Sequence, residues 1–183
     1  MKSLLKGVNL YLVGMMGAGK TTVGREIASR LGYGFVDTDA VIEQVAGQSI
    51  SQLFASVGEA AFRQVESKVL ASVCAYKNLA IATGGGIVLE RENWSYLHHG
   101  LIVWLDAPAE LLYARLQTDT SRPLLNDPKP ELKLKALLDQ RRSLYAQADL
   151  RITISNEETP SQIAMRVLEE IPTVLKPGVS ELL

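Results

Sequence analysis

The chain has 183 residues, 47% hydrophobic and 21% charged, which is the composition of an ordinary folded domain large enough to bury a core. Its 19 basic and 20 acidic residues leave a net charge of −1, which excludes the strong positive field of a nucleic-acid-binding or membrane-surface protein. The single cysteine, Cys74, excludes an internal disulfide and suits a reducing compartment, where we expect it to be a packed helix residue.

A glycine-rich stretch at residues 14–21 matches the phosphate-binding template G-x-x-x-x-G-K-[ST] at every fixed position. It follows the apolar run 8–13, a predicted strand too short for a signal peptide or membrane span, and precedes the helix-forming run 22–31. Lys20 supplies a charge for the β and γ phosphates, and the Thr21 hydroxyl suits a Mg²⁺ ion. A turn that only joined strand to helix would not need this lysine and threonine, so the stretch predicts a nucleotide site.

A second strand is predicted at residues 33–36, and it ends in Asp37-Thr38-Asp39. In an extended chain the two carboxylates would project to the same side, toward the phosphate loop. The alternative is that one aspartate only caps a helix beginning near residue 40. For a pair beside a phosphate loop we favour a function in holding a metal ion and a hydroxyl.

Residues 40–56 have a short, broken helical pattern, which we interpret as an inserted substrate flap. A longer helix is predicted from residue 59 to about 76. On this helix Arg63 lies three residues before Glu66 and four residues after Glu59. Surface ion pairing explains this spacing as well as a functional role does, so the pattern alone leaves both open.

The buried run 79–83 predicts a third strand, and Gly84, Gly85 and Gly86 follow it. Three consecutive glycines cost backbone entropy without adding packing, so they indicate a close approach of a ligand rather than a loose turn. The next helix ends at His98 and His99, to which we assign no catalytic or metal role because a solvated helix terminus explains them.

A fourth strand is predicted at residues 101–106, and Asp106 at its end imitates the second acidic motif of phosphate-loop enzymes. An acid followed by an early proline and another acid is also typical of a helix start. We therefore expect Asp106 to cap the helix at 109–116, and we assign support of the metal ion to Asp37 instead.

Residues 118–130 lose all periodicity and contain Arg122, which predicts either a lid over a nucleotide or an ordinary surface connection. The following helix, predicted at 131–148, places two adjacent arginines on different faces. Arg141 faces inward and Arg142 faces away. The inward stripe also contains Leu134, Leu137, Leu138 and Tyr145. A buried guanidinium requires an anion, so Arg141 is expected to meet a carboxylate of the protein or of a substrate.

A fifth strand at 150–154 and a last helix starting at 160 complete the pattern. Five strands alternating with helices predict an α/β fold with a parallel sheet covered on both faces, in three α/β/α layers. We expect one domain over the whole chain, with a substrate flap at about 38–65, a lid at about 118–130 and a frayed tail at about 172–183.

Together these motifs resemble the shikimate kinase family, within the group of nucleoside monophosphate kinase-like folds. The likeness runs from about residue 10 to 170, through GMMGAGKTTVGR, DTD, FRQVE, GGG, SRPLL and QRRSLY. The stretch WSYLHHGLIVWLDAP is similar to plant and cyanobacterial members, which implies the cytoplasm, or the plastid stroma for a plant precursor. The resemblance implies ATP-dependent phosphorylation of the 3-hydroxyl of shikimate, in the biosynthesis of chorismate and aromatic amino acids, by a Mg²⁺-dependent enzyme that we expect to be a monomer.

The resemblance also implies roles for the residues on the nucleotide side. Thr21 would ligate Mg²⁺, and Asp37 would support the ion through water. Arg122 would reach the transferring phosphoryl group, and Arg115 would stack on adenine. The ATP phosphates would be held by Gly17, Ala18, Gly19, Lys20, Thr21 and Thr22.

On the acceptor side, the resemblance implies that Asp39 holds the hydroxyls of shikimate and could also accept the proton. Arg63 and Arg141 would clamp the substrate carboxylate, with Glu66 orienting Arg63. The triple glycine 84–86 would shape the same pocket.

Two other readings remain open from the sequence. A small-metabolite kinase such as a gluconate kinase would share the ATP half of the site, and a non-catalytic relative would bind a nucleotide or a partner without turnover. The chain departs from many family members by having Ser143 in place of a proline, and by lacking an arginine at 156–159 near the expected adenine position. Neither departure removes a residue of the implied chemistry.

Overall fold

The computed structural model describes residues 4–117 and 128–175, and its centre is a five-stranded parallel sheet. The strand order is β2-β3-β1-β4-β5, with all four pairings parallel. The strands are β1 (Leu10–Val13), β2 (Gly34–Asp37), β3 (Leu79–Ala82), β4 (Leu101–Asp106) and β5 (Leu150–Thr153). Every side chain of β1 and β4 is buried, as expected for strands covered on both faces. The fold is therefore the predicted three-layer α/β/α arrangement.

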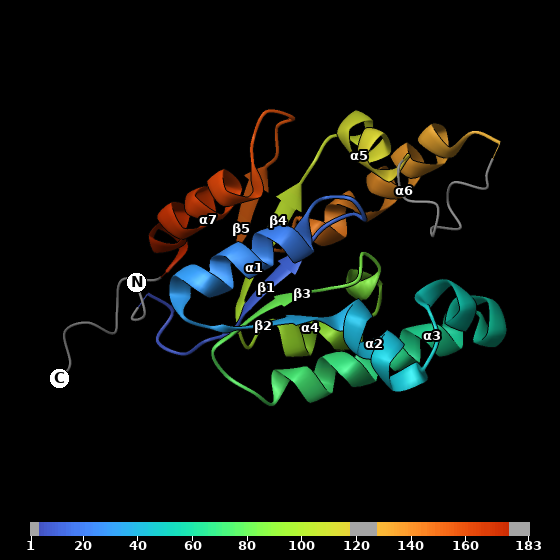
Figure 1. Cartoon of the computed structure of the whole chain (residues 1–183), viewed down its shortest axis with the longest axis horizontal. Coiled ribbons are helices and arrows are strands. Elements are labelled where there is room, and N and C mark those ends of the chain that lie inside the picture. Colours follow the sequence, from blue (N-terminus) through green and yellow to red (C-terminus); the bar gives the residue numbers. More distant parts are fainter. Residues whose placement is uncertain (1–3, 118–127, 176–183) are drawn as a thin grey trace.

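The helices cover both faces of this sheet. Helices α1 and α7 lie side by side over one face, and α3 and α4 pack together over the other (Figure 1). The helical elements are α1 (Lys20–Leu31), α2 (Thr38–Ala46), α3 (Ile50–Cys74), the short 3₁₀ turn η1 (Ile87–Leu89), α4 (Arg91–Leu97), α5 (Ala109–Leu116), α6 (Pro130–Tyr145) and α7 (Pro160–Val174).

Several helix ends are fixed by local sequence. The side chain of Ser49 caps α3 and that of Thr159 caps α7, each in a reciprocal capping box with the glutamine three residues later. Gly58 has φ 78° and interrupts α3, so the predicted helix from residue 59 is the second part of a longer element. Helix α7 continues through Pro172 to Val174, slightly beyond the predicted start of the tail at about residue 172.

The only cysteine is a packed residue, as predicted. Cys74 ends α3, half-buried, and its sulfur accepts a hydrogen bond from the Tyr11 hydroxyl of β1 at 3.1 Å. Burial raises the pKa of the Cys74 thiol, so the reactive thiolate is disfavoured.

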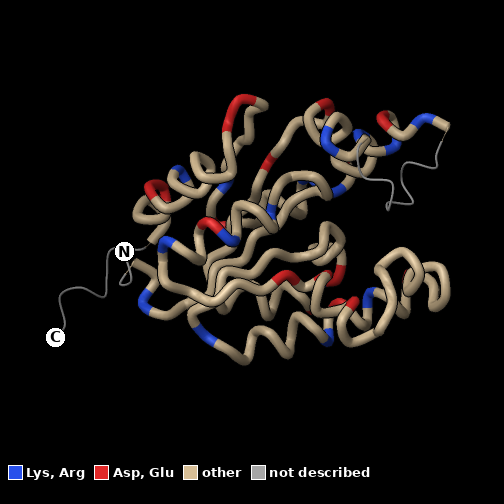
Figure 2. The backbone as a smooth tube through the Cα atoms, viewed as in Figure 1, with Lys and Arg blue, Asp and Glu red and all other residues tan. Residues whose placement is uncertain are grey.

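Basic and acidic residues are interspersed along the backbone (Figure 2). Within the two described ranges, no helix combines the length and apolarity needed to cross a membrane.

Three motifs follow directly on the carboxyl ends of three neighbouring strands. The phosphate loop follows β1, the DTD sequence begins with the last residue of β2, and the triple glycine follows β3 shortly after its end. Because the strands are parallel and adjacent, these ends share one edge of the sheet. In an open α/β sheet this edge is where ligands bind.

Candidate active site

The phosphate loop makes a tight turn into α1. Gly19 has φ 91° and stands at the N-cap of α1, so a residue with a β-carbon would be strained there. Lys20 is buried, and its Nζ donates hydrogen bonds to the carbonyls of Gly14 at 2.8 Å and Met15 at 2.9 Å. The lysine charge is therefore held against the loop, next to the backbone N–H groups at the start of α1.

Asp37 connects this loop to the second motif. Its Oδ2 accepts a hydrogen bond from the Thr21 hydroxyl at 2.6 Å, and its Oδ1 accepts the Asp39 backbone N–H at 3.0 Å. Helix α2 begins at Thr38, whereas the sequence predicted a start near residue 40. The prediction of an extended chain through Asp39 is therefore wrong. Asp37 is therefore the cap of α2, as one of the two alternatives predicted, and it also contacts the phosphate loop.

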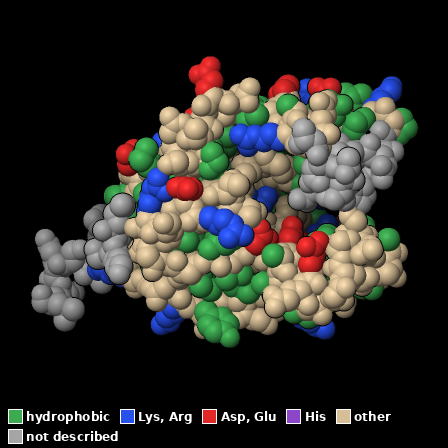
Figure 3. Space-filling view, in the orientation of Figure 1, with side chains coloured by type: hydrophobic (Ala, Val, Ile, Leu, Met, Phe, Trp, Pro, Cys, Tyr) green, Lys and Arg blue, Asp and Glu red, His purple; other side chains and the backbone are tan. Residues whose placement is uncertain are grey.

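Asp37 and Asp39 nevertheless face the same hollow, which has a volume of about 220 Å³. Residues from all three motifs line it, among them Lys20, Thr21, Asp37, Asp39 and Gly85. In the space-filling view, acidic and basic side chains gather around a hollow in the middle of this face (Figure 3). The sequence prediction that the acidic pair lies beside the phosphate loop is therefore correct, although the reason given for it is not.

A second hollow of about 250 Å³ lies on the other side of the phosphate loop. Arg115 of α5 lines it, and its Nη1 donates to the Gly17 carbonyl at 3.2 Å. Four further lining residues were not among the predicted site residues: Val23, Glu158, Pro160 and Ile163. The last three follow β5 at the same edge of the sheet, so the strand-end rule could have identified them. An ion pair with Arg166 lowers the pKa of Glu158, which keeps this carboxylate charged.

The triple glycine is surrounded by functional side chains. A β-carbon on Gly84 would lie 2.6 Å from Glu66 Oε1 and 2.8 Å from Asp39 Oδ1, and one on Gly86 would overlap the guanidinium of Arg63. The backbone is also held in place, because the Gly84 N–H donates to the Thr38 hydroxyl at 3.1 Å. The glycines therefore provide space for charged side chains, besides any approach by a ligand.

Arg63 and Glu66 pair on α3 below the surface, since Glu66 is buried and Arg63 is half-buried. The side chain of Arg63 is 13% exposed and that of Glu66 is 4% exposed, and their ion pair is joined by Glu59 at 3.2 Å from Arg63 Nη2. Burial raises the pKa of the Glu66 carboxyl, an effect that the nearby Arg63 charge opposes. Within the described part of the chain, the buried Arg63 Nε has no hydrogen-bond partner.

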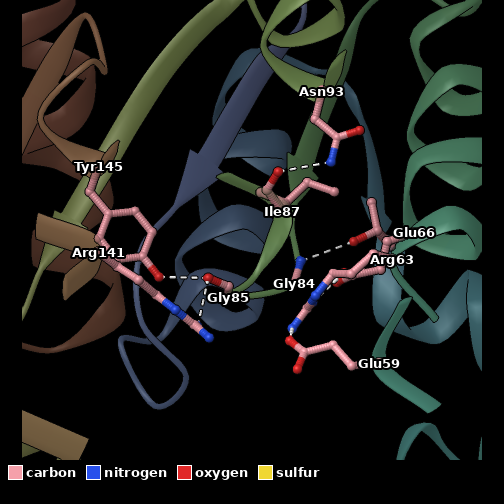
Figure 4. Close-up of polar contacts among 10 residues, drawn as sticks. Glu59, Arg63, Glu66, Gly84, Gly85, Ile87, Asn93, Arg141 and Tyr145 are labelled. Atoms are coloured by element: carbon pink, nitrogen blue, oxygen red, sulfur yellow. Dashed lines mark hydrogen bonds and ion pairs between the residues drawn. The ribbon is translucent and has the colours of Figure 1, made fainter. Parts of the chain in front are cut away.

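Arg141 faces inward and Arg142 faces outward, as the helical pattern predicts. Arg141 is half-buried, and its Nη1 donates to the Gly85 carbonyl at 3.2 Å, whereas the Arg142 side chain is 45% exposed. Figure 4 shows that Arg63 from α3 and Arg141 from α6 approach the triple glycine from two sides. Two residues that are 78 positions apart in the sequence thus meet at the triple glycine.

The prediction for Asp106 is wrong. The N-cap of α5 is Pro108, and Asp106 makes no capping bond. Asp106 is 5% exposed and accepts hydrogen bonds from Arg151 Nε at 2.9 Å and Nη2 at 2.5 Å, with Arg142 Nη1 at 3.7 Å. A buried carboxylate needs such partners, and the basic residues of β5 and α6 provide them. The predicted lid residue Arg122 lies outside the described residues.

Comparison with known proteins identifies the family. The family model described as shikimate kinase matches residues 16–172. A shikimate kinase of Nostoc sp. (strain PCC 7120) is 65% identical, over 98% of this chain and 99% of the relative. The structure of a shikimate kinase from Acinetobacter baumannii in complex with shikimate aligns with a TM-score of 0.90 and 40% identity, over 96% of this chain and 99% of that one.

A gluconokinase from Sinorhizobium meliloti also aligns, with a TM-score of 0.55 and 17% identity over 92% of this chain and 93% of that one, a likeness of fold alone. The chain belongs to the shikimate kinase family and is an ATP-using phosphotransferase.

Proposed function

We propose that this chain transfers the γ-phosphoryl group of ATP to the 3-hydroxyl of shikimate, giving shikimate 3-phosphate and ADP. The observation that supports the roles of the residues is that Arg63 and Arg141 converge on the triple glycine, of which Gly85 lines the same hollow as Lys20 and Asp39. Two guanidinium groups beside a nucleotide site suit an acceptor with a carboxylate and a hydroxyl.

On the nucleotide side, Lys20 and the backbone N–H groups from Gly17 to Thr22 bind the phosphates. The Lys20 ammonium now bonds two loop carbonyls, and it would exchange them for phosphate oxygens, which are stronger acceptors because they are charged. The hollow with Arg115, Glu158 and Pro160 takes the base and ribose. Arg122 of the predicted lid remains a candidate for contact with the transferring phosphoryl group.

On the acceptor side, Arg63 and Arg141 bind the carboxylate of shikimate, and the buried Arg63 Nε supports this role because it lacks a partner among the described residues. Glu66 fixes the Arg63 guanidinium through their ion pair. Asp39 accepts a hydrogen bond from the 3-hydroxyl and takes its proton as the new P–O bond forms. Phosphoryl transfer needs little covalent help, so positioning and charge neutralisation account for most of the catalysis.

The residues present fit a magnesium ion. Thr21 and Asp37 place a hydroxyl and a carboxylate oxygen together at the mouth of the phosphate loop, and hard oxygen ligands of this kind suit Mg²⁺. Mg²⁺ usually needs only one or two protein oxygens, with water and phosphates supplying the rest. Within the ranges 4–117 and 128–175, no three or more His, Cys, Asp or Glu side chains are grouped so that they could hold a metal ion by themselves. When bound, the ion would neutralise charge on the phosphates of ATP.

The metal assignment makes a prediction for the Thr21 hydroxyl. Thr21→Val should raise the Mg²⁺ concentration needed for half-maximal activity by about tenfold, because it removes an oxygen ligand while keeping the side-chain shape. Thr21→Ser keeps the hydroxyl and should stay within about twofold of the parent chain. A titration of activity with Mg²⁺ after removal of metal by EDTA measures both. Equal Mg²⁺ requirements for Thr21→Val and the parent chain would remove Thr21 from the metal site.

The acceptor is tested by a coupled assay of ADP release with ATP and Mg²⁺. Shikimate should give turnover, whereas gluconate and the reaction without an acceptor should give only background release. Turnover with gluconate would favour the rival small-metabolite kinase. Absence of turnover with every acceptor, in folded protein that still binds ATP, would favour a non-catalytic relative.

We also propose that the enzyme is a cytoplasmic monomer. The large exposed hydrophobic side chains of the described residues are scattered over different elements, such as Val45 on α2, Tyr76 after α3 and Leu132 on α6, and scattered residues of this kind are usual on monomers. The similar proteins come from cyanobacteria and other bacteria, which supports the cytoplasm over the plastid alternative. Light scattering should give a mass close to the 20.0 kDa of one chain.

A further inference from the structure

Tyr145 is a buried residue of α6 that has no role in the proposed reaction. Its side chain is 0% exposed, and its hydroxyl donates to the Gly85 carbonyl at 2.6 Å. The ring stacks on Trp104 of β4, with 5.8 Å between ring centroids. The sulfur of Met15, in the phosphate loop, lies 3.5 Å from the same hydroxyl. Tyr145 therefore spans the space between the sheet, the phosphate loop and the triple glycine.

The Gly85 carbonyl receives two hydrogen bonds from one helix. Arg141, one turn before Tyr145 on α6, donates to the same oxygen at 3.2 Å, as Figure 4 shows. A carbonyl oxygen has two lone pairs, so the phenol and the guanidinium can bind it together. The phenol bond is the shorter of the two, and the stacked ring leaves its hydroxyl little freedom to move. The phenol thus fixes the point that Arg141 contacts.

The Tyr145 phenol stays protonated, so it can always donate its hydrogen bond. Burial raises the pKa of Tyr145 to about 12, so the phenol remains neutral and keeps its proton throughout the physiological range. A neutral donor at this position satisfies the carbonyl without adding a second charge beside Arg141. The Arg141 guanidinium keeps its remaining N–H groups for an anion in the pocket.

We propose that Tyr145 is a positioning residue for the acceptor substrate: its hydroxyl fixes the Gly85 carbonyl, and this carbonyl orients the Arg141 guanidinium toward the substrate carboxylate. The proposal rests on the proposed function, in which Arg141 binds that carboxylate. Without the phenol, Arg141 is the donor that remains to the Gly85 carbonyl among the described residues. This bond would then hold the guanidinium back from the substrate. The glycine segment would also be free to shift.

The test compares two variants that each remove one buried phenol hydroxyl. Tyr145→Phe keeps the ring that stacks on Trp104, and the matched control Tyr11→Phe removes the hydroxyl that bonds Cys74, on the central strand and away from the three motifs. Tyr145→Phe should raise the KM for shikimate about fivefold, the effect of one hydrogen bond, with the KM for ATP and kcat within about twofold. Tyr11→Phe should leave all three parameters within about twofold.

A double-mutant cycle with Arg141→Ala tests whether the effect passes through the arginine. If it does, adding Tyr145→Phe to Arg141→Ala should change the shikimate KM by less than about twofold, because the group to be oriented is already absent. Thermal unfolding of each variant reports stability separately. Tyr145→Phe and Tyr11→Phe are expected to lower the midpoint to a similar extent.

The outcomes separate this inference from the proposed function. If Arg141→Ala raises the shikimate KM but Tyr145→Phe does not, the positioning role is wrong and the carboxylate clamp stands. If Arg141→Ala itself has no effect on the shikimate KM, the clamp is wrong. Additive effects of the two substitutions, or a loss of thermal stability in Tyr145→Phe with unchanged kinetics, would make the phenol a purely structural group and overturn the positioning role.

Discussion

Arg141→Ala is expected to raise the KM for shikimate about 100-fold, while the Kd for ATP changes less than about threefold. The physical reason is that a half-buried guanidinium binding a carboxylate makes charge-assisted hydrogen bonds, and a 100-fold change corresponds to about 2.7 kcal/mol. The nucleotide should be unaffected because Arg141 contacts the triple glycine on the acceptor side, whereas Lys20 contacts the phosphate loop. Steady-state kinetics for shikimate and direct titration with ATP measure the two constants.

The neighbouring arginine provides a matched control for this prediction. Arg142→Ala removes the same charge from the same helix, but Arg142 is turned toward Asp106 and solvent. Its shikimate KM should stay within about twofold of the parent value. Equal losses of shikimate and ATP binding in Arg141→Ala, or equal effects of the two alanine variants, would contradict the assignment of Arg141 to the carboxylate.

Lys20→Ala is expected to lower kcat about 10³-fold, because it removes the mobile charge that stabilises the β and γ phosphate oxygens as charge redistributes during transfer. The substitution also removes the hydrogen bonds from the lysine to the carbonyls of Gly14 and Met15, so circular dichroism and thermal unfolding must show that the variant is folded. Assays at saturating ATP and shikimate isolate this effect from substrate binding.

Lys68→Ala, on the exposed side of α3, is the matched control because it also removes one ammonium group. It should keep kcat within about twofold of the parent value. A loss of less than about tenfold in Lys20→Ala, with the protein folded, would mean that the backbone N–H groups alone stabilise the transferring phosphoryl group.

The features that sequence predicted well are those with a local or periodic cause. The phosphate loop has a fixed spacing, the five strands are short runs that are either apolar or, as in β5, alternate apolar and polar residues, and the inward position of Arg141 follows from the 3.6-residue period of a helix. All of these agree with the structure. The family resemblance then supplied the roles that spacing alone left open, above all for Arg63.

The errors arose where tertiary partners decide the outcome. Asp106 has the local sequence of a helix cap, but Arg151 on the adjacent strand binds its carboxylate instead. Asp37 was expected to be either a cap or a functional group, and it is placed to serve as both because α2 begins directly after β2. No local pattern shows that the Tyr145 hydroxyl reaches Gly85, since the two residues are 60 positions apart in the sequence.

The most direct measurement is a crystal structure of this chain with shikimate bound. The account predicts that the substrate carboxylate lies within about 3.2 Å of guanidinium nitrogens of both Arg63 and Arg141, with the 3-hydroxyl beside Asp39 and facing Lys20. A carboxylate bound elsewhere, or a 3-hydroxyl turned away from the phosphate loop, would contradict it.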